Sequence, residues 1–177
     1  KARMARVAAV DRDQLLLLDE GGAFRGKLSG KFLHEAVAAL ERPCVGDWVW
    51  VERAPGDPLG IVHGVVERKT ELGRKAAGES GEFQRIAANV DVVLIVQSCH
   101  YDFNLNRLER YLVMVREGGA TPCVLLTKTD LVAPEVLAGQ LGEIRSAGIE
   151  APVLTLSNVT HEGVDELRRR LASGETY

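Results

Sequence analysis

The chain has 177 residues, of which 46% are apolar and 27% charged, and its formal net charge at pH 7 is −3. This composition is typical of a globular protein with one core or two small ones, and it excludes a disordered or strongly basic chain. No apolar run approaches the roughly 20 residues that span a bilayer, and no secretory apolar block follows the first residues. Three cysteines, far apart and in apolar surroundings, favour reduced thiols in a cytoplasmic protein with no membrane partner.

The first part of the chain shows short apolar runs separated by turn signals. These runs cover residues 6–10, 15–18, 24–28, 45–51 and 61–68. Their number and spacing predict a small closed five-stranded barrel over residues 1–69. Residues 31–40 have the content of either a short helix or a loop, and we favour the loop. Trp48 and Trp50 share one face of their strand, where we favour structural packing over base stacking.

The spacing of the apolar residues changes further along the chain. Residues 70–84 are polar and contain glycine, which predicts a linker or mobile loop. Buried-type strands and helices then alternate over residues 90–96, 104–117, 122–126, 134–147, 153–156 and 163–171. This βαβαβα order predicts that residues 85–177 form a parallel sheet with ligands at the carboxyl ends of its strands.

The second strand of that sheet runs directly into Thr127, Lys128 and Asp130. A carboxylate at such a strand end can accept from N1–H and N2–H₂ of guanine, whereas adenine presents an unprotonated ring nitrogen. The Lys128 stem can lie along the base while its ammonium stays in water. The alternative is a turn in which Asp130 caps a helix.

The third strand ends in a similar way, at Ser157 and Asn158. The Ser157 hydroxyl can order the loop, and the backbone N–H of Asn158 can donate to the guanine O6 that adenine lacks. Taken alone, Ser157 fits a capping turn with Glu162 better. Together with Thr127, Lys128 and Asp130, it favours a guanine-binding site.

A phosphate-binding glycine loop of the form Gly-x-x-x-x-Gly-Lys-Ser/Thr is missing ahead of these residues. The nearest match, residues 21–28, ends in Leu28, which has no oxygen for a magnesium ion. We expect a glycine hairpin there. The His, Cys and acidic residues show no spacing typical of a metal site, and we assign no metal ligand.

Several motifs resemble one family over nearly the whole chain, the ribosome small subunit-dependent GTPase A family of circularly permuted GTPases. They are Val-Gly-Asp-Trp-Val at 45–49, Arg-Lys-Ala-Ala-Gly at 74–78, Ile-Ala-Ala-Asn-Val-Asp at 86–91 and Asp-Phe-Asn-Leu-Asn-Arg-Leu-Glu-Arg-Tyr-Leu at 102–112. The resemblance implies an OB-fold barrel followed by a G domain whose motifs run in the order G4, G5, G1, G2, G3. Thr127, Lys128 and Asp130 match G4, and Ser157 with Asn158 matches G5. Thr127 replaces the usual Asn and Asn158 the usual Ala, which implies weaker ties to the phosphate loop.

The same resemblance implies a GTPase of late small-subunit assembly that binds GTP or GDP with Mg²⁺, docks on the small ribosomal subunit and binds its rRNA through the barrel. Residues 173–177 resemble the start of the strand before the phosphate loop, so we expect the motifs G1 to G3 to follow them. We expect the family's zinc-binding domain to follow as well, since its ligands are not in this chain. We therefore assign no catalytic residue, and we expect the 177-residue chain alone to be inactive.

Two basic clusters are candidates for binding rRNA, although a solvated face is the plainer interpretation of each. The first cluster is Arg25, Lys27 and Lys31, and the second is Arg74 and Lys75. Their presence leaves a different function open, in which a non-enzymatic RNA-binding adaptor uses the barrel for binding and the α/β half as a scaffold. A less favoured alternative is an α/β domain for another small molecule.

Overall fold

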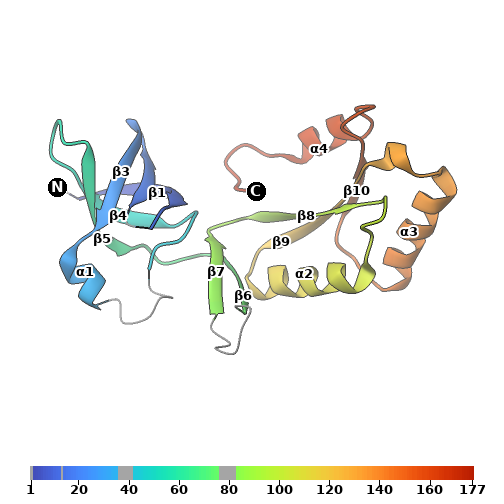
Figure 1. Cartoon of the computed structure of the whole chain (residues 1–177), viewed down its shortest axis with the longest axis horizontal. Coiled ribbons are helices and arrows are strands. Elements are labelled where there is room, and N and C mark those ends of the chain that lie inside the picture. Colours follow the sequence, from blue (N-terminus) through green and yellow to red (C-terminus); the bar gives the residue numbers. More distant parts are fainter. Residues whose placement is uncertain (1, 13, 36–41, 76–82) are drawn as a thin grey trace. The chain divides into compact units, whose positions relative to one another are not determined.

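The structure is a computed structural model that describes residues 2–12, 14–35, 42–75 and 83–177 (Figure 1). The chain forms two compact units, Lys1–Val90 and Asp91–Tyr177. The first unit contains a barrel and a hairpin, and the second contains a parallel sheet with its helices.

The first unit is built around a closed five-stranded barrel with the strand order β1-β2-β3-β5-β4. The strands are β1 (Arg3–Val10), β2 (Leu15–Asp19), β3 (Gly22–Leu28), β4 (Trp48–Glu52) and β5 (Leu59–Val65). Only the β3–β5 pair is parallel, and β4 pairs back onto β1 to close the barrel. Alternating inward residues such as Val7, Leu17 and Val49 fill its core. The predicted OB-fold barrel is therefore confirmed.

The glycine pair at the start of β3 forms a hairpin and not a phosphate loop. Asp19 pairs with Gly22 across the β2–β3 turn, and Gly22 has a φ of 106°, which a side chain would strain. The segment that follows Gly21 is thus a strand of the barrel, as the sequence predicts.

Two expectations about this unit differ from the structure. Gly30–Glu35 form the helix α1, where we favoured a loop. The helix starts there because the Ser29 hydroxyl accepts the N–H of Phe32 at 3.1 Å and so caps the first turn. Residues 36–40 of the expected loop lie outside the described part. Trp48 and Trp50 face outward, 39% and 44% exposed, so they are not packed in the barrel core. The guanidinium of Arg6 lies 5.6 Å from the centre of the Trp48 ring.

The structure also differs from the linker expected over residues 70–84. Strands β6 (Glu71–Lys75) and β7 (Phe83–Ala88) pair as an antiparallel hairpin; residues 76–82 between them are not described. The two strands pair despite their polar composition because Leu72 and Ala88 are buried and Arg85 forms an ion pair with Glu71.

The second unit has a three-stranded parallel sheet in the order β10-β9-β8. Its elements are β8 (Val92–Ser98), α2 (Leu105–Glu117), β9 (Thr121–Thr127), the 3₁₀ turn η2 (Thr129–Leu131), α3 (Pro134–Ser146), β10 (Val153–Leu156) and α4 (Val164–Arg170). Figure 1 shows α2 and α4 on opposite sides of this sheet. Alternate residues of β9 pack on each side, with Leu125 in a cluster that includes Leu167 of α4. The predicted βαβαβα order and the parallel sheet are confirmed.

Candidate guanine-binding site

The carboxyl ends of β9 and β10 lie side by side, since Leu156 pairs with Thr127 in the parallel register. This register brings the two loops that the sequence singles out to the same edge of the sheet. Thr127 is tied to the neighbouring strand β8 through its hydroxyl, which donates to the Gln97 carbonyl at 3.3 Å. Its own carbonyl accepts the N–H of Cys99 at 2.9 Å.

Lys128 turns the chain out of the sheet. Its φ of 59° and ψ of 39° lie in the left-handed region, which is uncommon for a residue with a side chain. The turn leaves the Lys128 side chain exposed and starts the 3₁₀ turn that carries Asp130. A backbone held in a sparsely populated conformation at a strand end is typical of a binding loop.

Ser157 and Asp130 join the two loops. Ser157 is completely buried, and its hydroxyl donates to Asp130 Oδ1 at 2.5 Å. The same hydroxyl oxygen accepts the N–H groups of Val159 and Thr160, both at 3.1 Å. These bonds fix the carboxylate of Asp130, and within the described residues no backbone N–H donates to it, so the helix-cap interpretation finds no support.

Asn158 follows Ser157 at the exposed surface of the loop. Its backbone N–H has no acceptor among the residues that the structure describes, so it is available to a ligand. Gly163 closes the loop beneath it with a φ of 76°, where a Cβ atom would lie 1.9 Å from the Thr155 carbonyl oxygen. Only glycine allows α4 to start so close to β10.

Gln97 supports the same edge of the sheet, and the sequence interpretation missed it. Its side chain is 1% exposed and binds the backbone of Asn104 twice, donating to the carbonyl at 3.2 Å and accepting the N–H at 3.1 Å. The Asn104 side chain in turn caps α2 by accepting from the N–H of Arg107. A polar residue near the end of an apolar strand was the available signal, because a buried amide needs partners.

Asp102, in the loop after β8, forms an ion pair with Arg107 of α2. The Arg107 guanidinium donates to Asp102, which holds the pKa of that carboxyl below its usual range, and Lys128 adds a weaker effect in the same direction. Asp102 therefore stays ionised close to Lys128 at neutral pH. Among the described residues no group of three or more His, Cys, Asp and Glu is placed to hold a metal ion.

The basic residues expected to bind RNA lie on three elements, β3, α1 and β6. Arg25 and Lys27 share the outer face of β3, where Arg25 forms an ion pair with Asp11, and Lys31 is the second residue of α1. Arg74 lies on β6, where it donates to Gln84 at 3.5 Å. Lys75 ends the same strand.

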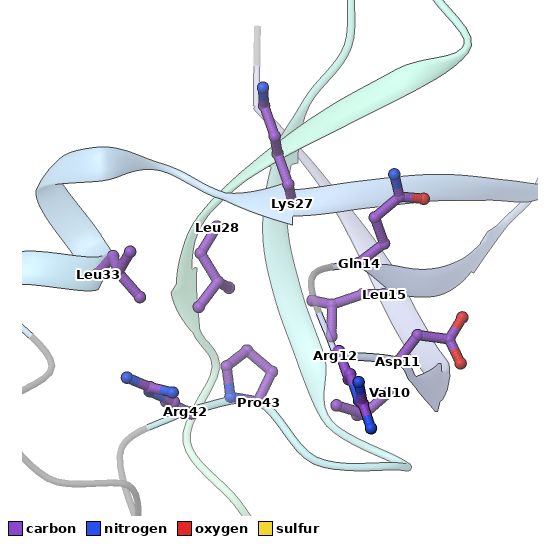
Figure 2. Close-up of a pocket in the computed structure, with 10 residues that line it drawn as sticks. All are labelled: Val10, Asp11, Arg12, Gln14, Leu15, Lys27, Leu28, Leu33, Arg42 and Pro43. Carbon is purple, nitrogen blue, oxygen red and sulfur yellow. The ribbon is translucent and has the colours of Figure 1, made fainter.

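A pocket of about 480 Å³ beside Lys27 contains two further basic residues that the sequence interpretation left out, Arg12 and Arg42. Figure 2 shows Lys27 extending away from the apolar side chains of Leu28 and Leu33, which also line this pocket. The sequence signal available for Arg12 was its place in the turn between the first two strands.

The barrel, followed by a parallel sheet with a Lys-x-Asp loop and a serine turn on adjacent strand ends, defines part of a circularly permuted GTPase. The family model described as RsgA GTPase matches residues 65–177, which is more than half of the chain. The chain belongs to the RsgA GTPase family.

Similar proteins agree with this assignment. The small ribosomal subunit biogenesis GTPase RsgA of Opitutus terrae is 37% identical over 97% of this chain and 48% of its own length. RsgA 1 of Listeria monocytogenes is 39% identical over 97% of this chain and 46% of its own length. The chain thus spans about half the length of these relatives.

Solved structures show the same fold. YjeQ from Thermotoga maritima matches 99% of this chain and 58% of its own with a TM-score of 0.76 and 22% identity. YloQ, described as a circularly permuted GTPase, matches 98% of this chain and 57% of its own with a TM-score of 0.70 and 20% identity. No helix among the described residues is long and apolar enough to cross a membrane.

Proposed function

We propose that the complete protein is a GTPase that acts in the biogenesis of the small ribosomal subunit, and that this chain supplies its guanine-recognition half. The names of its relatives support the first part. The hydrogen bond from Ser157 to Asp130 supports the second part, guanine recognition, because it holds a carboxylate at the edge of the sheet where this kind of fold binds ligands. The proposal places the protein in the cytoplasm with the small ribosomal subunit and guanine nucleotide as partners.

Guanine recognition follows from the donors and acceptors of the two loops. The Asp130 carboxylate accepts from N1–H and N2–H₂ of the base, with its direction set by Ser157. The backbone N–H of Asn158 donates to O6, and the Lys128 stem lies along the face of the ring. Adenine would leave the carboxylate facing an unprotonated ring nitrogen and the N–H without an acceptor. Leaving polar groups unpaired once the base covers them is the strongest form of discrimination available to such a site.

Hydrolysis needs groups other than these. In GTPases the phosphates are held by a glycine loop, its lysine and Mg²⁺, and catalysis is mainly positioning and charge neutralisation. None of the residues assigned here does this, so we assign this chain no catalytic residue. The OB-fold barrel is proposed as the rRNA-binding part, with Arg25, Lys27, Lys31, Arg74 and Lys75 as candidate contacts.

Exchanging Asp130 for Asn tests the proposal in the complete protein. The amide offers one donor and one acceptor where guanine presents two donors, so Asp130→Asn is expected to shift preference from GTP toward XTP by about 10⁴-fold. Competition binding with the two nucleotides measures the shift, and Asp165→Asn, at an exposed site on α4, is the matched control. An unchanged ranking of GTP over XTP would contradict the guanine role of Asp130 and favour the non-enzymatic adaptor.

A further inference from the structure

A pocket of the α/β unit lies between α3 and the loop that follows β8. It has a volume of about 440 Å³. One side is a stripe of α3 that includes Val136, Gly139 and Gln140, which the helical repeat places on one face. Tyr101 and Phe103 of the loop form the other side.

Gln140, which lines this pocket, has a buried acceptor without a partner among the described residues. Its side chain is 8% exposed, and its amide nitrogen donates to the Cys99 carbonyl at 2.8 Å, which fixes the orientation of the amide. Its oxygen Oε1 is buried and has no partner among the described residues. A buried acceptor of this kind is normally satisfied, so the pocket is suited to a ligand that donates a hydrogen bond.

The backbone conformation of Tyr101 keeps its side chain exposed to solvent. Tyr101 is 96% exposed and has a φ of 62°, an unusual conformation for a bulky residue. The loop is anchored at its start, where the Ser98 hydroxyl exchanges hydrogen bonds with the backbone of His100. Its end is anchored by the Gln97 side chain on Asn104. A strained aromatic residue on a loop fixed at both ends is typical of a prepared contact surface.

The charge of the residues that line the pocket indicates which kind of ligand it suits. Glu143 is the one charged side chain among the described residues that line the pocket, and it forms no ion pair with another described residue. The residues that line the pocket therefore include a buried amide oxygen, a carboxylate and two aromatic rings, of which that of Tyr101 is exposed. A guanidinium matches all three, because it is a planar cation with several donors that also stacks on aromatic faces.

We propose that this pocket binds an arginine side chain presented by a partner protein, with Gln140 Oε1 and the Glu143 carboxylate as acceptors and Tyr101 as the stacking surface. A lysine fits less well, since its ammonium is a compact, strongly hydrated point charge without a stacking plane. A nucleobase offers donors and a flat face but no positive charge for Glu143. This inference does not rest on the proposed GTPase function.

The test follows the Gln140 side-chain amide by NMR in the isotopically labelled chain. N-acetyl-argininamide is titrated as the probe, with N-acetyl-lysinamide and adenosine as comparisons. We expect a saturable shift for the arginine probe with a Kd on the order of millimolar, and binding at least about 10-fold weaker for the other two. No saturable shift, or equal binding of the lysine probe, would overturn the proposal, and tighter binding of adenosine would replace the protein partner by a nucleic acid.

Two variants tie the binding to the pocket. Gly139→Leu fills it, and a Cβ atom there meets nothing within 4 Å, so the helix is preserved. Gly142→Leu is the matched control on the same helix, at a position equally free of neighbours and outside the pocket. Tyr101→Gly removes the ring and at the same time suits the positive φ. We expect Gly139→Leu and Tyr101→Gly to weaken the arginine probe at least about 10-fold, while Gly142→Leu leaves it unchanged; equal affinity in all three overturns the proposal.

Discussion

Arg68 binds the completely buried Asp47 with two nitrogens, Nε to Oδ1 and Nη2 to Oδ2, both at 2.7 Å. The hydrogen bonds to Asp47 raise the pKa of Arg68 further above its ordinary value, so the guanidinium stays charged. Asp47 also accepts the N–H of Cys44 at 2.8 Å. The pair thus joins the segment after β5 to the turn before β4 and helps to close the barrel.

Removing the charge of Arg68 should lower the stability of the folded protein. Arg68→Met leaves the Asp47 carboxylate buried without its cation, and we expect the free energy of unfolding to fall by about 3 kcal/mol. Arg25→Met is the control, because Arg25 and Asp11 form an ion pair whose side chains are 49% and 58% exposed. We expect it to cost less than about 1 kcal/mol. Denaturant unfolding of both variants measures the difference, and a loss for Arg68→Met of less than about 1 kcal/mol would contradict the predicted cost of leaving Asp47 without its cation.

Cys44 should be a poorly reactive thiol although it is only partly buried. Burial, with the nearby Asp47 carboxylate, raises its pKa to about 12 from 9.0. Because fewer thiolates form, reaction with a small disulfide reagent at pH 8 is expected to be about 10- to 100-fold slower than for a free cysteine. The raised pKa in the folded state means that this thiol stabilises the protein fully below pH 9, and the contribution is lost between pH 9.0 and about 12.

A chain with Cys99 and Cys123 replaced by Ala reports on Cys44 alone. Those two thiols are buried, and burial raises the pKa of each. The same chain unfolded in denaturant gives the reference rate at the same pH. A folded-state rate equal to that reference would contradict the raised pKa of Cys44.

Ser157→Ala tests the bond that orients Asp130. The change removes the donor to the carboxylate and the acceptor of the Val159 and Thr160 N–H groups. Since hydrogen bonds to charged groups contribute about 1.5–3 kcal/mol, we expect the complete protein to bind GDP about 10- to 100-fold more weakly. Equilibrium binding of a fluorescent GDP analogue measures the loss. Ser173→Ala, at an exposed position, is the control, and GDP affinity matching that control would show that Asp130 needs no support from Ser157.

The sequence predicted the strand ends better than the loops around them. Thr127 and Ser157 could be placed together because carboxyl ends of parallel strands meet at one edge, which the pairing of Leu156 with Thr127 confirms. Their role as guanine ligands stays a prediction. The support from Gln97 could not be foreseen, because its two bonds to Asn104 depend on how the loop after β8 folds back.

Short polar elements account for the other differences. The helix α1 has six residues, so its spacing carries little signal, and the Ser29 cap decides its formation. The β6–β7 hairpin lacks a regular alternation of apolar residues, and its pairing depends on contacts such as Arg85 with Glu71. Such contacts between residues distant in sequence cannot be predicted from periodicity.

The barrel cluster of Arg25, Lys27 and Lys31 gives a prediction that depends on salt. Lys27 and Lys31 are the two residues to change, which keeps the ion pair between Arg25 and Asp11 intact. If both contact phosphates of rRNA, replacing them with Ala in the complete protein should flatten the plot of log K against log salt for small-subunit binding by about 0.7 to 0.9 per lost contact. Arg168→Ala with Arg169→Ala on α4 removes the same charge from exposed positions and is the control. Should the Lys27 and Lys31 variant keep the slope of the unaltered protein, the cluster is a solvated face, and Arg74 and Lys75 of β6 are the next residues to replace.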